Sequence, residues 1–407
     1  MFYQVGIYLY YNIMHSGALQ KLSAREDILP ILLSGGYGFL SSLTYFFLPL
    51  FLKDHLLFSG SKIGILYAGL SITGIFITFP IGFLNDLFTP RSLIMFSLII
   101  TALSLWGQAV TISFIPFFLV FLLFGISNNL FRVSLDALLF KLEKTENQVT
   151  RYGLYNGMRM IGFTAGAVFA GYSLLSLDFP ATLKGLSIIS LLLLLAYPFL
   201  PASPGRKWEL FNYRQDFFKK EVMVFSLWLF FFTLHWGAES TCFSLFLRDN
   251  LKLPMIGIGY YMAAEFLTVA LTSFYCGRLI DRGISFERLL YPGLIASGLG
   301  HLLMTYPHVY FSLFWRIIHG VGDGAVILVM YEGIGRLFHV DRVGGNASLI
   351  YLVTLAGSFA GALIFGPLGE KLGYGVPLAS SGIITLSLLL VLVWWQRREE
   401  SRSADVL

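Results

Sequence analysis

Long apolar runs alternate with short polar segments along most of the chain. Each run holds roughly 20 residues with few charges, which is the length of a helix that crosses a bilayer. No segment shows the weak alternation that is typical of a transmembrane barrel strand. The pattern predicts an all-α membrane protein with twelve transmembrane helices. They cover approximately residues 29–52, 61–85, 92–112, 116–139, 152–176, 182–199, 222–247, 257–280, 288–306, 309–334, 345–367 and 376–395.

The spans fall into two groups of six. Residues 201–221 are polar and hold five basic residues, so we expect a cytoplasmic linker there. It separates an N-terminal six-helix bundle, residues 29–200, from a C-terminal one, residues 222–396. The apolar stretch of residues 2–14 is too short to span, so we expect residues 1–28 to form a cytoplasmic or interfacial segment. Residues 397–407 form a polar cytoplasmic tail, which we expect to be disordered.

One loop pattern occurs twice, 195 positions apart, and each copy follows the second span of its half. Other residues repeat with the same offset and without a gap, so the two halves are an internal duplication. The residues of interest are Gly82, Asp86 and Arg91 in the first copy, and Gly277, Asp281 and Arg282 in the second.

Composition and charge agree with this reading. The chain is 56% hydrophobic and 13% charged, whereas a soluble domain carries roughly 25% charged residues. Of the 28 basic residues, 19 fall in segments on the side of the termini, 6 in the opposite loops and 3 within spans. This bias places both termini in the cytoplasm and the chain in the cytoplasmic (inner) membrane. The net charge of +5 is spread over these loops and does not indicate nucleic-acid binding. Cys242 and Cys276 lie in apolar runs and suggest neither a disulfide framework nor a metal site.

Several spans contain ionisable side chains. Each costs about 2.5–3.5 kcal/mol at the bilayer centre on insertion scales, so we expect these side chains to face protein or water. Their spacing places neighbours within one span on one helical face. They are Arg132 with Asn128, Arg159, His235 with Glu239, Glu265, and Arg316 with His319 and Asp323.

The repeat assigns these groups to different halves. Asn128 and Asp323 are equivalent, so both should face the axis between the halves. The equivalents of the other titratable residues of the second half cannot titrate, so the titratable cluster belongs to that half alone. His235, Glu239, Glu265, Arg316 and His319 correspond to Leu40, Thr44, Leu70, Phe121 and Phe124.

The duplicated loop resembles the signature Gly-x-x-x-Asp-Arg-x-Gly-Arg-Arg of the major facilitator superfamily. The second copy has the Asp-Arg-Gly run, whereas the first has Leu87 and Thr89 at two of the usual positions. The likeness covers residues 29–396. It implies two six-helix bundles related by a parallel pseudo-two-fold axis, around a central cavity. It also implies a secondary active transporter and not an enzyme. Such a protein moves a small solute by alternating access as a monomer, with no cofactor other than a proton gradient.

The Asp residues of the loop motif could act as a latch. An Asp at a helix end can accept hydrogen bonds from basic residues or from another helix's N-terminus, and such a contact between bundles can hold one conformation. The glycines permit close helix contact. The alternative is that the basic residues only set the topology.

The ionisable cluster predicts proton coupling, because a group that changes protonation during a cycle links proton movement to conformation. Asp323 is the leading candidate, with His319, Glu265, Glu239 and Arg316. The alternatives are static ion pairs and sodium coupling.

The layout resembles that of sugar–proton symporters related to lactose permease. Asn156 stands where they have a sugar-binding Arg, and Phe163 where they have a stacking Trp, so a galactoside is not expected. The run 166–171 lacks the Pro of the drug antiporters' signature, which favours symport. Arg132 and Arg159 would suit an anionic substrate, or could pair with Asp136. The predicted cavity residues are Asn128, Arg132, Asn156, Arg159, Phe163, His235 and Trp236.

Three other functions compete. The run Gly320-Val321-Gly322-Asp323 matches the Gly-x-Gly-Asp signature of intramembrane aspartyl proteases. That chemistry needs two Asp residues that share a proton, and no second Asp lies deep in another span. A lipid or lysolipid flippase and a non-transporting membrane sensor of the same fold remain alternatives.

Overall fold

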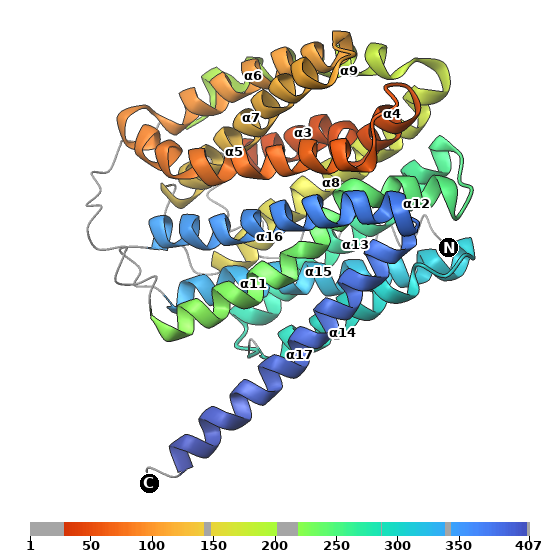
Figure 1. Cartoon of the computed structure of the whole chain (residues 1–407). Coiled ribbons are helices and arrows are strands. Elements are labelled where there is room, and N and C mark those ends of the chain that lie inside the picture. The colour runs from red at the N-terminus through yellow and green to blue at the C-terminus, as the bar shows by residue number, and fades with distance from the viewer. Residues whose placement is uncertain (1–27, 142–147, 202–218, 286, 338–342, 405–407) are drawn as a thin grey trace, which may run out of the picture.

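The computed structural model describes residues 28–141, 148–201, 219–285, 287–337 and 343–404, which are helical apart from short turns (Figure 1). Eleven helices in these ranges are at least 18 residues long and apolar enough to cross a membrane. Helix α14 has 17 residues, at the short end of the spanning range. Each of the twelve predicted spans therefore corresponds to a helix.

The N-terminal half lies at the top of Figure 1. It consists of α3 (Ile28–Ser42), a π turn (Leu43–Phe47), α4 (Leu48–Asp54), α5 (Gly60–Leu87), α6 (Pro90–Val110), α7 (Phe114–Lys141), α8 (Gln148–Ser176), α9 (Phe179–Leu192) and a 3₁₀ turn (Leu193–Phe199).

The C-terminal half lies below it. It consists of α11 (Lys220–Ala238), a π turn (Glu239–Phe243), α12 (Ser244–Asp249), α13 (Met255–Asp281), α14 (Glu287–Leu303), α15 (Val309–Leu337), α16 (Val343–Leu372) and α17 (Gly375–Ala404).

The two halves pack their helices in the same way. In the first half, α3 packs on α8, α5 and α6 on α7, and α6 on α9. In the second half, the equivalent helices make the equivalent contacts: α11 on α16, α13 and α14 on α15, and α14 on α17. The predicted parallel repeat of two six-helix bundles is therefore present in the packing.

The turn after α4 repeats in atomic detail after α12. The backbone nitrogen of Phe58 donates to the carbonyl of Leu52, and that of Leu253 to the carbonyl of Leu247. Leu57, at φ 52°, has the same conformation as its equivalent Lys252, at φ 54°. Residues other than glycine are uncommon in this left-handed region. A strained conformation at both equivalent positions therefore supports the predicted offset of 195 residues.

Two seams join the halves, α5 with α16 and α8 with α13. A Cβ atom on Gly64 would lie 2.6 Å from the Ala362 carbonyl oxygen, and one on the equivalent Gly259 would lie 2.6 Å from the Ala167 carbonyl oxygen. Backbones at this separation leave no space for a side chain, as at other small-residue contacts between membrane helices. The seams are thus equivalent too.

The end of the chain differs from the expectation of a disordered tail. Helix α17 continues through Trp395 to Ala404 and runs away from the bundle in Figure 1. Residues 396–400 are Gln, Arg and Glu, which are good helix formers, so a polar sequence does not end the helix here.

Candidate transport site

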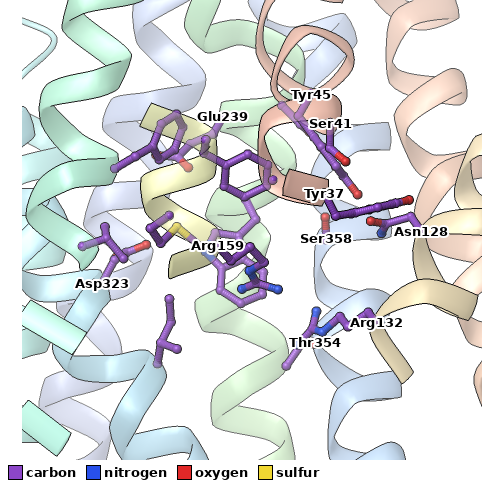
Figure 2. A pocket seen from close by; sticks show the side chains of 18 of the residues that line it. Tyr37, Ser41, Tyr45, Asn128, Arg132, Arg159, Glu239, Asp323, Thr354 and Ser358 are labelled. Carbon is purple, nitrogen blue, oxygen red and sulfur yellow. The ribbon is translucent and has the colours of Figure 1, made fainter. Parts of the chain in front are cut away.

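A cavity of about 260 Å³ lies between the halves (Figure 2). It is lined by α3, α5, α7 and α8 from one half and by α11, α13, α15 and α16 from the other. Both π turns reach it, through Tyr45 and Phe46 in the first half and Glu239 and Ser240 in the second. π turns are frequent at functional sites, because they shift the register of a helix by one residue.

The N-terminal wall carries two arginines. The guanidinium of Arg132 lies 3.8 Å from the centre of the Tyr351 ring, which comes from α16 of the other half. Arg159 donates from Nη2 to Asn156 Oδ1 at 2.8 Å, and its buried Nε has no hydrogen-bond partner among the described residues. The ion pairs between described residues include neither arginine, even though Asp136 lies one turn beyond Arg132.

The C-terminal wall carries three carboxyl groups, those of Glu239, Glu265 and Asp323. Arg316 lies behind them and is only 2% exposed. Its Nη1 donates to Glu239 Oε1 and its Nη2 to Glu265 Oε2, so one guanidinium bridges two carboxylates. Its plane also rests on the Phe243 ring, 3.9 Å from the ring centre. A buried cation with two carboxylate partners satisfies the usual requirement for burial of charge.

Three buried histidines stand beside these carboxylates, and their partners define which ring nitrogen carries the proton. Nδ1 of His235 lies 2.5 Å from the Phe232 carbonyl oxygen, and Nδ1 of His319 lies 2.9 Å from that of Ser297. A carbonyl oxygen only accepts, so both Nδ1 atoms are donors.

His301 follows the same rule through a hydroxyl. Its Nδ1 lies 2.8 Å from Ser381 Oγ, which donates its own proton to the Leu378 carbonyl oxygen and so accepts from the ring. All three rings therefore turn Nε2 toward the carboxylates.

The Nε2 atoms meet carboxylate oxygens at short distances. His301 and His319 each place Nε2 3.2 Å from Glu239 Oε1, and His235 places it 3.1 Å from Asp323 Oδ2. The His301 and His235 contacts have the geometry of hydrogen bonds, whereas His319 Nε2 makes no hydrogen bond among the described residues. In the neutral tautomer a lone pair on Nε2 would face a lone pair on oxygen, so each of the two hydrogen-bonded contacts needs a proton between the two atoms.

The charges indicate how many protons the cluster holds. Three ionised carboxyl groups and one guanidinium leave two negative charges uncompensated when the histidines are neutral. A buried group of charges is costly unless it is balanced. Two exchangeable protons, shared between the histidines and the carboxylates, would neutralise the cluster.

The same cluster is a poor fit for a metal ion. Ligand atoms of His235, Glu239 and His319 lie within 4.8 Å of one another. The Arg316 guanidinium, however, already donates to the Glu239 oxygen that would be a ligand. A cation there would sit beside a fixed positive charge, which disfavours binding. The prediction that the chain has no metal site stays a prediction.

Five of the seven predicted cavity residues line the cavity, namely Asn128, Arg132, Arg159, Phe163 and Trp236. Asn156 lies behind the wall, where its amide nitrogen donates to Ser273 Oγ at 3.0 Å across the seam between α8 and α13. His235 also lies behind the wall, because Asp323 stands between it and the cavity. In Figure 2, Asn128 and Arg132 lie at the right, Asp323 and Glu239 at the left, and Arg159 between them.

Sequence reasoning missed His301 and the tyrosines of the wall. His301 lies in the ninth apolar run, so a search for every ionisable residue within a span would have found it. Tyr37, Tyr45 and Tyr351 carry no such signal, because aromatic residues are common in all of the apolar runs.

The second copy of the loop motif joins the halves. Asp281 ends α13, and its Oδ2 accepts from the backbone nitrogen of Thr150 at 2.7 Å and from Thr150 Oγ1 at 2.5 Å. Thr150 is the third residue of α8, so its N–H is one of the donors that a helix leaves unsatisfied at its start. A Cβ on Gly277 would lie 2.8 Å from the Val149 carbonyl oxygen, so this glycine permits the contact. Arg282 is exposed.

The first copy of the motif is described only in part. Gly82 and Asp86 belong to α5, but the structure does not describe the surroundings of either residue. Arg91 lies 5.2 Å from the centre of the Tyr197 ring. The latch at this copy stays a prediction.

The opposite end of the bundle has its own contacts between the halves. Arg248 pairs with Asp54, and Lys53 pairs with Glu370. Lys53 and Arg248 are equivalent positions in the repeat. These side chains are between 24% and 39% exposed, so each pair contributes only about 0–1 kcal/mol.

The family model of the Major Facilitator Superfamily matches residues 31–247 and again residues 225–406. No curated protein sequence matches the chain.

Solved structures with a similar fold include transporters. A mutant form of the nucleoside transporter NupG has 15% sequence identity and a TM-score of 0.74, covering 91% of this chain and 99% of that one. NupG itself has 16% identity and a TM-score of 0.70, covering 90% and 97%. The human organic anion transporter MFSD10 has 16% identity and a TM-score of 0.66, covering 90% and 99%. At these identities the likeness shows the fold.

Proposed function

Because the chain belongs to the Major Facilitator Superfamily, we propose that it is a proton-coupled secondary transporter that carries a small organic solute. It works by alternating access and favours symport, in the cytoplasmic membrane with both termini inside. The α4 and α12 end of the bundle then faces outward, and the Asp281 end faces the cytoplasm.

One observation carries the proton coupling. Glu239, Glu265 and Asp323 line the cavity, and three histidines behind two of them turn Nε2 toward carboxylate oxygens. Protons can therefore reach the carboxyl groups from the cavity and be shared with the imidazoles. A change in their number changes the charge of the wall by whole units, which gives the two conformations different proton affinities.

The contacts between the halves support alternating access. The Asp281–Thr150 contact joins the halves at one end of the bundle, and the two ion pairs join them at the other end. The cavity opens to a given side only when the contacts on that side break. The solute class is supported by the names of two similar structures, a nucleoside transporter and an organic anion transporter.

Asp323→Asn tests the coupling. Its equivalent in the first half is Asn128, so the scaffold accepts an amide at this position. In proteoliposomes with radiolabelled nucleosides and organic acids, we expect a pH gradient to drive accumulation by the wild type but not by Asp323→Asn. Exchange of solute without net proton movement should persist in both.

Two results would contradict the proposal. Accumulation by Asp323→Asn against a gradient would move the coupling to Glu265 or Glu239. Accumulation by the wild type that ignores the pH gradient for every transported solute would remove proton coupling altogether.

A further inference from the structure

We infer that the substrate is a small organic anion with a planar ring, whose carboxylate or phosphate group is bound by Arg132 and Arg159. This rests on the proposed function only in that the cavity is taken to be the transport site. The inference concerns the N-terminal wall, whereas proton coupling concerns the opposite wall.

The first argument is charge. Both arginines line the cavity, and neither forms an ion pair with a described residue. Arginine is always charged, and intramembrane charges are almost always paired. Asp136, one turn beyond Arg132, acts electrostatically on both arginines, but one carboxylate cannot balance two guanidinium groups. The excess positive charge on this wall therefore indicates that an anion enters the cavity.

The second argument is that packing does not require these arginines. The repeat places Ile327 at the position of Arg132 and Thr354 at that of Arg159, and both of these also line the cavity. The same scaffold thus accepts an apolar and a neutral side chain there. The arginines are peculiar to the half that lacks the titratable cluster.

The third argument is orientation. The Tyr351 ring covers one face of the Arg132 guanidinium, and Asn156 holds one nitrogen of Arg159. A stacked guanidinium still presents its N–H donors at its edge, in the fork geometry that suits carboxylate and phosphate. Both groups are held in place before a ligand arrives, which lowers the entropic cost of binding.

The fourth argument is the rest of the wall. Four rings lie together at the cavity, with Phe46 and Phe266 4.5 Å apart between ring centres, Phe46 and Phe163 5.4 Å apart, and Tyr45 and Phe163 6.1 Å apart. Aromatic surfaces favour planar apolar bodies. A cavity of about 150 Å³ already holds benzene, so about 260 Å³ accommodates a ring with an anionic substituent.

The opposite wall sets the direction of the ligand. Glu239, Glu265 and Asp323 present carboxyl oxygens to the cavity, which repel an anion whenever they are ionised and attract it in no protonation state. The charged group of the ligand therefore lies toward the arginines and its ring toward the aromatic cluster. A solute of this kind would enter with its charge at one wall while protons bind at the other.

Matched pairs of probes test the inference on the full-length purified protein. We would measure binding of benzoate, phenyl phosphate and 2-naphthoate, each against its neutral amide or methyl ester, without any gradient. We expect at least one anion to bind more tightly than its neutral partner, and the carboxylate and phosphate arms show which group is preferred. If no anion binds better than its neutral partner, the inference is wrong.

Variants locate the site. Arg132→Ile and Arg159→Thr introduce the residues of the equivalent positions, and each should weaken binding of the anion by about 30-fold or more. Lys184→Ala removes the same charge outside the cavity, introduces the equivalent residue Ala379, and should leave affinity unchanged. Unchanged affinity in both arginine variants would place the anion elsewhere.

The two proposals fail separately. Asp323→Asn should still bind the anion, because its carboxyl group belongs to the other wall. Loss of accumulation with retained binding concerns the coupling, whereas loss of binding in the arginine variants concerns recognition.

Discussion

Removal of the charge at Asp281 should open the end of the bundle where α13 meets α8. One oxygen of this carboxylate accepts both the backbone N–H and the hydroxyl of Thr150. A hydrogen bond to a charged group contributes about 1.5–3 kcal/mol, and a negative charge at a helix start adds about 0.3–1 kcal/mol. Asp281→Asn keeps an accepting oxygen but loses the charge, so we expect a cost of about 1–2 kcal/mol, or a 5–30-fold increase in opening.

Thr150 provides a graded comparison. Thr150→Val removes the hydroxyl but keeps the backbone N–H, so its cost should be about 1 kcal/mol. Adding Thr150→Val to Asp281→Ala should cost little more than Asp281→Ala alone, because the hydroxyl has then already lost its partner. Such non-additivity is what a double-mutant cycle reports for two groups in contact.

The chain contains its own reporter of this opening. Cys276 is 6% exposed and packs against Val149 and Ile280 in the same seam. Its rate of alkylation by a maleimide, divided by the rate in denatured protein, measures how often the seam opens. We expect this rate to rise 5–30-fold in Asp281→Asn, in line with about 1–2 kcal/mol.

Cys242 provides the internal control. It is 0% exposed and donates to the Phe365 carbonyl oxygen within the C-terminal half, away from the seam. Its alkylation should be unchanged by Asp281→Asn. Equal acceleration of both thiols would indicate general destabilisation, and an unchanged Cys276 would refute a latch at Asp281.

Two further predictions concern single residues. Gly277→Ala should accelerate alkylation of Cys276, because its Cβ would lie 2.8 Å from the Val149 carbonyl oxygen. Gly185→Ala, whose Cβ would have nothing within 4 Å, should behave as wild type. Equal alkylation rates in the two variants would contradict the close seam. His301→Gln keeps an N–H donor near Glu239 but cannot take up a proton, so gradient-driven accumulation in proteoliposomes should fall while exchange persists. Accumulation by this variant at the level of the wild type would exclude His301 from the coupling.

Much of the architecture follows from the sequence because the bilayer constrains it strongly. A spanning segment must satisfy its backbone hydrogen bonds internally, so a long apolar run predicts a helix and little else. The repeat then predicts which helices are equivalent. The equivalence extends to backbone conformation, because Leu57 and Lys252 are unlike residues that adopt the same left-handed conformation in equivalent turns.

The candidate site could be predicted only as far as helical faces. The spacing of Arg316, His319 and Asp323 places them on one face, and the structure brings all three together with Glu239. Spacing cannot show which neighbouring helix covers a face. Asn156 is covered by Ser273 of α13, so it holds the seam and does not line the cavity.

The protonation of the histidines could not be predicted from the sequence for a similar reason. The tautomer of a histidine depends on the partner of its second nitrogen, and those partners are the backbone carbonyl of Ser297 for His319 and a hydroxyl on α17 for His301. The serine comes from a different helix in both cases. Only the packed structure shows that both rings point Nε2 at the same Glu239 oxygen.

The duplication explains why recognition and coupling can be separated by mutation. Each half supplies charges at positions where the other has neutral residues. Arg132 and Arg159 are equivalent to Ile327 and Thr354 in the repeat, and Asp323 is equivalent to Asn128. The scaffold has therefore folded with the neutral residue at every one of these positions in one half or the other. Substitution by the residue of the opposite half therefore removes a charge and introduces a side chain that the fold already accepts at the equivalent position. If each half performs one task, such exchanges should abolish one task and leave the other, whereas a cavity in which both walls share both tasks would lose them together.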